Sequence, residues 1–287
     1  MNSAMDLRPL SVGETLDRSF GIYRRLLVPL LLIQLICVAP VYPFQLYFVG
    51  SGRELSGWYF LFALLGFVLS SLASAATALL IAERYLGREL SAGDSIRRSL
   101  PRVGAVIAVS LLLGLVLMIS AMPALLSIAA GGGLAAVSAQ GGGSPSMGAA
   151  GAALGLMLVG LALMVLPVIV ASALAVSLPA LIVEHRNAGA ALSRSWALTK
   201  GRRLRVAFTL FVFLLILMIP YIGVGLLFGF ATSANSDGAL PVFVLQYAIS
   251  LLLTPLLYCV ITLLYFDLRV RREAFDLEML AGQVATA

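Results

Sequence analysis

The sequence predicts an all-α, polytopic membrane protein with six transmembrane helices in a single membrane domain, residues 1–287. Three observations support this fold class. Of the 287 residues, 61% are hydrophobic and only 11% are charged, and long apolar stretches recur along the whole chain. A soluble domain has about a quarter of its residues charged, so this chain could not cover itself with polar surface.

Each predicted span is an apolar run bounded by charged residues or by a glycine-rich turn, and crossing a bilayer takes about twenty such residues. The uncharged stretch 131–148 separates the third and fourth spans and is predicted to be a flexible linker rather than a segment that dips into the headgroups. The spans cover residues 26–49, 58–83, 103–130, 149–183, 205–232 and 241–267.

Basic residues predict the orientation. Eighteen of the nineteen Lys and Arg residues lie before the first span, after the second, after the fourth or after the sixth, and Arg53 is the exception. Because basic loops resist translocation, both termini and the two basic loops are expected to face the cytoplasm. No cleavable signal peptide is evident, so the first span is expected to act as a signal anchor.

Three cytoplasmic segments align without gaps and indicate an internal repeat. They read LSVGETLDRSF, LSAGDSIRRSL and RNAGAALSRSW, and each begins near a residue suited to a helix N-cap: Ser11, Ser91 and Asn187. Each segment also carries an apolar pair at i,i+4 that could lie on the membrane. These pairs are Leu16 with Phe20, Ile96 with Leu100, and Leu192 with Trp196.

Each of these short helices precedes a pair of spans, and the second span of each pair ends in an acid, Glu83, Glu184 or Asp267. The sequence therefore predicts three parallel repeats of a cytoplasmic interfacial helix plus a helical hairpin. The alternative is that short basic amphipathic helices are generic topology signals whose similarity is coincidental. The repeat units cover approximately residues 10–84, 90–184 and 186–268.

The C-terminal segment 268–287 is predicted to continue the last helix into the cytoplasm. Opposite charges recur there at i,i+4 and can neutralise one another locally. We expect this helix to dock on the short helices, with another protein as the alternative. The charged pairs are Asp267 with Arg271, Arg269 with Glu273, and Arg272 with Asp276.

Two sets of residues are candidates for binding. Arginines just cytoplasmic of a span attract anionic lipids, so the repeated Arg-Ser pairs are candidates for lipid headgroups; alternatively, the arginines only fix orientation and pair with acids. The last span has a polar residue at every fourth position, which can line a pathway or form interhelical hydrogen bonds. The headgroup candidates are Arg18, Ser19, Arg98, Ser99, Arg194 and Ser195, and the pathway candidates are Gln246, Ser250, Thr254, Tyr258 and Thr262.

The sequence contains few residues that could support enzyme chemistry. His185 is the only histidine, and neither a Ser-His-Asp set nor a phosphate-binding loop is present. No Asp, Glu, Lys, Arg or His lies near the centre of a predicted span, which counts against a proton-driven pump. We therefore predict no enzymatic activity, metal or cofactor. The pI of 9.7 is explained by topology, so no nucleic-acid partner is expected.

Three stretches resemble a bacterial family, the membrane domain of glycerophosphoryl diester phosphodiesterases. They read RPLSVGETLDRSFGIYRR, ALIVEHRNAGAALSRSWALTKGRRLRV and LLYFDLRVRREAFDLE. Some relatives carry this domain fused to a barrel phosphodiesterase, which is absent from this chain. The resemblance implies a multi-pass protein of the bacterial cytoplasmic membrane and gives no catalytic residue.

The sequence thus favours a lipid-interacting or scaffold module that binds membrane lipids, anionic ones in particular, or a membrane or cytoplasmic protein. The alternative function is a transporter or lipid-translocating protein with a pathway between the hairpins.

Overall fold

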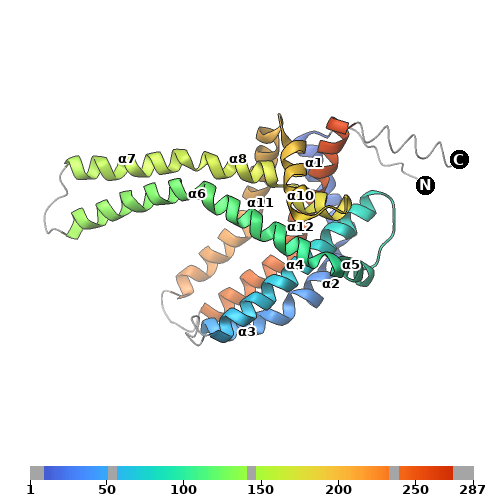
Figure 1. Ribbon diagram of the computed structural model, residues 1–287. Helices are drawn as coiled ribbons and strands as arrows, with labels where there is room; N and C mark the ends of the chain where they lie inside the picture. Colours follow the sequence, from blue (N-terminus) through green and yellow to red (C-terminus); the bar gives the residue numbers. More distant parts are fainter. Residues whose placement is uncertain (1–9, 51–56, 141–146, 233–238, 274–287) are drawn as a thin grey trace.

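The computed structural model describes residues 10–50, 57–140, 147–232 and 239–273, and the regular structure in these ranges is helical throughout (Figure 1). The helices are α1 (Val12–Arg25), α2 (Leu27–Cys37), η1 (Ala39–Val41), α3 (Tyr42–Gly50), α4 (Gly57–Tyr85), α5 (Ala92–Ser99), η2 (Leu100–Arg102), α6 (Val103–Gln140), α7 (Met147–Leu163), α8 (Val165–Leu174), α9 (Ser177–Val183), α10 (Ala188–Thr199), α11 (Arg203–Thr232) and α12 (Ala239–Glu273).

Six helical segments are long and apolar enough to cross a membrane, and each contains most or all of one predicted span. The third segment joins the short helix α5 to α6. The prediction of an all-α protein with six candidate spans is therefore confirmed. The segments are Leu27–Phe48, Gly57–Tyr85, Ala92–Ser138, Met147–Val183, Arg203–Leu226 and Phe243–Glu273.

Prolines divide two of the spans. The first span is broken into α2, η1 and α3 at Pro40, and the fourth is broken near Pro167 and again near Pro179. Proline lacks a backbone N–H and disfavours helical geometry in the residue before it. Gln34 and Tyr42, on either side of the break in the first span, line a cavity.

The predicted linker over 131–148 is wrong in part, because residues 131–140 continue α6 and residues 147–148 begin α7. A Cβ on Gly131 would lie 2.7 Å from the carbonyl oxygen of Ala153, and one on Gly160 would lie 2.8 Å from that of Ala124. Glycine therefore allows α6 and α7 to approach closely, as small residues do between membrane helices. Residues 141–146 lie outside the described residues.

The second helices of the three predicted hairpins form the centre of the bundle. Helices α4, α9 and α12 all contact one another, and the other long helices surround them. Helix α2 packs against α4 and α12, α6 against α4 and α8, and α11 against α8 and α12. The paired helices α6 and α7 extend away from the rest of the molecule (Figure 1).

The three short helices have the N-caps that the sequence predicts. Ser11 forms a capping box with Glu14, in which each side chain accepts a hydrogen bond from the backbone N–H of the other residue. Ser91 accepts from the N–H of Asp94, and Asn187 accepts from the N–H of Ala190. Helix α1 packs on α12, α5 on α4, and α10 on α8 and α9.

The small residues of these short helices face the protein rather than the surroundings. Equivalent positions four residues apart are buried in all three helices: Thr15 and Ser19, Ser95 and Ser99, and Ala191 and Ser195. The predicted apolar face is only partly free, because Leu16, Phe20, Ile96 and Leu192 pack against the core while Leu100 and Trp196 remain exposed.

Candidate functional site

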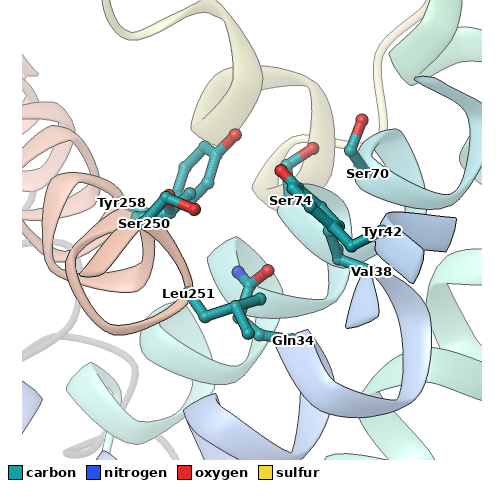
Figure 2. A pocket seen from close by; sticks show the side chains of 9 residues that line it. Gln34, Val38, Tyr42, Ser70, Ser74, Ser250, Leu251 and Tyr258 are labelled. Atoms are coloured by element: carbon teal, nitrogen blue, oxygen red, sulfur yellow. The ribbon is translucent and has the colours of Figure 1, made fainter. Parts of the chain in front are cut away.

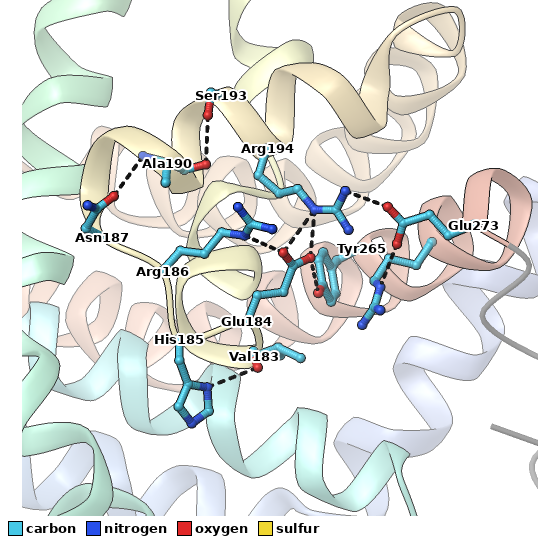
Figure 3. A network of polar contacts seen from close by, with 11 residues as sticks. Val183, Glu184, His185, Arg186, Asn187, Ala190, Ser193, Arg194, Tyr265 and Glu273 are labelled. Carbon is cyan, nitrogen blue, oxygen red and sulfur yellow. Dashed lines mark hydrogen bonds and ion pairs between the residues drawn. The ribbon is translucent and has the colours of Figure 1, made fainter. Parts of the chain in front are cut away.

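The charged end of the bundle contains three acids, each near the end of a central helix. Glu184 follows α9 and accepts hydrogen bonds from three side chains (Figure 3). Its partners are Arg186 at 2.5 Å, Arg194 at 2.8 Å and the Tyr265 hydroxyl at 2.9 Å. Arg194 also contacts Glu273 at 2.5 Å, so this cluster joins α9, α10 and α12.

The charged groups of the Glu184 cluster are paired with one another. Burial on its own would raise the pKa of Glu184, but hydrogen bonds from Arg194, Arg186 and Tyr265 outweigh it and hold the pKa below the ordinary value. Burial would likewise lower the pKa of Arg194, yet Glu273 and Glu184 raise it above the ordinary value. These groups therefore stay charged and paired near neutral pH.

Asp267 near the end of α12 forms a second cluster and is only 2% exposed. It accepts a hydrogen bond from the backbone N–H of Leu10 at 2.7 Å and ion-pairs with Arg271 at 2.9 Å and with Arg205 at 3.9 Å. Both arginines also donate to the Leu10 carbonyl. Leu10, which precedes the N-cap of α1, is thus bound to α11 and α12 by both of its backbone polar groups.

The end of α4 is different, because it is open. Among the residues that the structure describes, the Glu83 carboxylate ion-pairs only with the largely exposed Arg88, at 3.5 Å, and Arg84 pairs with the exposed Glu89 at 3.0 Å. Beside them lies a cavity of about 440 Å³, which we call the α4-end cavity. Its lining residues are Arg25, Leu26, Pro29, Leu80, Arg84, Glu89, Leu90 and Ser91.

A second, smaller cavity of about 130 Å³ lies within the bundle between the first span, α4 and α12 (Figure 2). We call it the inner cavity. Most of its lining residues carry a polar group that is uncharged at neutral pH. The lining residues are Gln34, Val38, Tyr42, Ser70, Ser74, Ser250, Leu251, Thr254 and Tyr258.

The Arg-Ser pairs do not form three similar open sites. Ser19, Ser99 and Ser195 are at most 1% exposed, and the Ser195 hydroxyl donates to the Ala173 carbonyl at 2.9 Å. The guanidinium of Arg194 is engaged by two carboxylates. Arg18 is partly buried, whereas Arg98 is exposed on α5. Hence the three serines pack in the protein interior, and the three arginines differ in environment.

The polar residues of the last span also differ in their surroundings, because only some of them line the inner cavity. Ser250, Thr254 and Tyr258 line the inner cavity, but Gln246 is not among its lining residues. Thr262 is fully buried, and its hydroxyl has no hydrogen-bond partner among the described residues. The stripe therefore does not line one continuous space.

Sequence reasoning missed several lining residues. Gln34 is the only amide in the apolar run LLLIQLIC, a signal that was available but was not used. Ser70 and Ser74 had the spacing of a packing seam, and their position on the inner cavity could be found only from the way the helices assemble. Arg25 and Arg84 were indistinguishable from the other basic residues that flank spans.

The comparisons with known proteins locate a family likeness in the second half of the chain. No curated protein matches the chain, and no solved structure does. The N-terminal motif RPLSVGETLDRSFGIYRR lies outside the range that a family model matches. Residues 151–271, which run from α7 into α12, match the membrane domain of glycerophosphoryl diester phosphodiesterase, and the predicted resemblance is confirmed over this range.

Proposed function

We propose that this integral membrane protein has no catalytic activity of its own and binds the headgroup of an anionic lipid in the α4-end cavity. One observation carries the proposal: the lining of this cavity combines apolar side chains with two arginines, one of them paired with Glu89, at the end of a membrane-spanning bundle. The apolar residues are Leu26, Pro29, Leu80 and Leu90, and the two arginines are Arg25 and Arg84.

The chemistry of the cavity suits a lipid better than a soluble anion. A lipid presents a charged headgroup next to apolar chains, and each cytoplasmic arginine near the surface attracts an anionic lipid by about 1 kcal/mol. Arg25 is exposed, and Arg84 keeps a side chain that is 45% exposed although it pairs with Glu89. A volume of about 440 Å³ is within the usual range for ligand pockets.

The ion pairs of Glu184 and Asp267 support a structural rather than a catalytic role for these two acids. A general acid or base needs a pKa near the working pH, whereas the pKa of Glu184 is lowered. Glu184 and Asp267 are both occupied by arginines. We therefore assign these two clusters to assembly of the bundle.

We further infer that the three hairpins are related as parallel repeats. The contacts support this: each short helix packs on the second helix of the preceding hairpin, with α1 following α12 in cyclic order. Each outer helix similarly contacts the second helix of the preceding hairpin and that of its own. This arrangement places all three short helices at one end of the bundle, and we propose that this end faces the bacterial cytoplasm.

A pathway between the hairpins is a weaker candidate. It would need Gln246 and Thr262 to share one lining with Ser250, Thr254 and Tyr258, and only the last three line the inner cavity. A cytoplasmic protein partner is a further alternative, and the Glu184 and Asp267 clusters leave the described part of α12 already docked on α1 and α10.

Native mass spectrometry of the purified protein with added phosphatidylglycerol or phosphatidylcholine tests the proposal. The double variant Arg25→Gln/Arg84→Gln should bind phosphatidylglycerol about 30-fold more weakly, because two arginine contacts are lost. The matched control is Arg97→Gln/Arg98→Gln, which removes the same charge from the exposed face of α5 and should bind normally.

A third variant, Glu89→Gln, removes the acid that pairs with Arg84 and should strengthen phosphatidylglycerol binding. Equal loss in the α5 control would reduce the effect to general attraction between charges and would overturn the assignment to this cavity. A lipid-free particle, or one that carries another protein, would favour the scaffold role instead.

A further inference from the structure

The inner cavity lies near the middle of three membrane-spanning segments, where a polar space is costly. Its lining comes from Gln34 and Tyr42 in the first span, Ser70 and Ser74 in α4, and residues 250–258 in α12. Polar side chains inside a membrane pair with one another or line a cavity that holds something polar. None of the lining side chains carries a charge at neutral pH.

Gln34 indicates that the cavity has an occupant. Its side chain is only 3% exposed, and its amide is directed into the cavity (Figure 2). A buried amide left unpaired is destabilising, so an occupant that accepts from its N–H groups and donates to its carbonyl is favoured.

The serine hydroxyls define which polar groups the occupant should carry. Ser70, Ser74 and Ser250 each donate to a backbone carbonyl of their own helix, at 3.0, 2.9 and 2.8 Å. Ser74 and Ser250 are in turn hydrogen-bonded to the hydroxyls of Tyr258 and Tyr42. The oxygens of Ser70 and of the two tyrosines can still accept a hydrogen bond. The lining is therefore rich in acceptors and is complemented by a molecule with several O–H donors.

Charge and size further limit which molecules could occupy the inner cavity. An anion in this uncharged lining would be desolvated without a counter-charge, which disfavours phosphates and other inorganic anions. An engineered protein cavity of about 150 Å³ binds benzene, a molecule of about six non-hydrogen atoms. The inner cavity, at about 130 Å³, is of similar size.

We propose that the inner cavity is a binding site for one small uncharged polyol, held by the Gln34 amide and by hydroxyl groups from α4 and α12. This site is independent of the α4-end cavity. It uses different residues, lies within the bundle rather than at its charged end, and selects against charge where the other site selects for it.

Saturation-transfer difference NMR on the full chain in lipid nanodiscs, prepared without glycerol, tests this site. Glycerol is the probe, and propan-1-ol is the comparator of similar size with a single hydroxyl. Glycerol should give a saturable signal and propan-1-ol a much weaker one. Gln34→Leu should weaken glycerol binding at least about fivefold, because an amide that both donates and accepts is lost.

The matched control is Gln45→Leu, the same chemical change in the same span but outside the cavity lining, and it should bind glycerol normally. If Gln34→Leu does not fold, Thr254→Val removes a hydroxyl from the lining at almost constant shape and should also weaken binding. The proposal is overturned if glycerol gives no signal, if propan-1-ol binds equally well, or if the folded variants bind like the wild type.

Discussion

The ends of α9 and α12 are closed by buried ion pairs, whereas the end of α4 opens onto a cavity. Glu184 and Asp267 have side chains that are 12% and 1% exposed and contact arginines at 2.8 and 2.9 Å. Glu83 has a 19% exposed side chain and meets Arg88, itself 70% exposed, only at 3.5 Å. Three acids in similar sequence positions therefore have different environments.

The source of the basic partners explains this difference. Glu83 has one local partner, five residues along the chain. Glu184 and Asp267 also receive arginines from other helices, Arg194 from α10 and Arg205 from α11. An acid becomes buried where distant segments bring it enough donors to offset the cost of removing it from water. Where they do not, as at Glu83, the end of the helix stays open beside a cavity.

The largest effect should come from Asp267→Asn. This change leaves Arg205 and Arg271 near a buried position without their counter-charge, and breaking a buried ion pair costs about 3–5 kcal/mol. Thermal unfolding measured with a thiol-reactive dye is suitable, because Cys37 and Cys259 are buried in the folded protein. An unchanged melting temperature would mean that this end of the bundle is not locked by charge.

Glu184→Gln should destabilise the fold by about 2 kcal/mol, since hydrogen bonds to charged groups contribute about 1.5–3 kcal/mol. The same dye assay measures it. Tyr265→Phe removes one of the hydrogen bonds to Glu184 and leaves the arginines, so it should cost about 1 kcal/mol. If the tyrosine variant were the more damaged of the two, hydrogen bonding rather than charge would dominate the cluster.

The contribution of Glu184 should also depend on pH. Its pKa in the folded protein is lowered, so its contribution is complete above the unfolded pKa of about 4.3 and is lost as the pH falls through the folded value. The difference in melting temperature between the wild type and Glu184→Gln should therefore be constant from pH 7 to about pH 5 and shrink at more acid pH. A difference independent of pH would contradict the ionised pairing.

The smallest effect should come from Glu83→Gln, at about 0.5 kcal/mol or less, because exposed ion pairs contribute little. Comparison with Glu184→Gln in the same assay measures the contrast between the closed and open ends directly. A loss as large as that of Glu184→Gln would show that the α4 end is locked as firmly as the others.

Local signals were sufficient to predict much of the fold from the sequence. The six spans followed from apolar length, and the N-caps at Ser11, Ser91 and Asn187 followed from residue type next to a helical pattern. The pairing of Asp267 with Arg271 followed from their spacing on one helix. Each of these depends on residues within a few positions of one another.

What could not be predicted depends on how distant helices meet. Arg194 was expected to be available for headgroups, but Glu273, which occupies it, is contributed by another helix. Glycines in 131–140 indicated a linker, because their use in bringing α6 close to α7 depends on the partner helix. The inner cavity required three spans to be placed side by side before Gln34 became informative.

The attachment of Leu10 to Asp267 has a consequence for the time course of synthesis. The two residues are 257 positions apart, and ribosomes add about 5–20 residues per second. Helix α1 is therefore complete about 10–50 s before the helix that binds it exists. During that interval α1 lacks its contacts with α12. Helix α1 can therefore reach its final docked position only after the last span has been inserted.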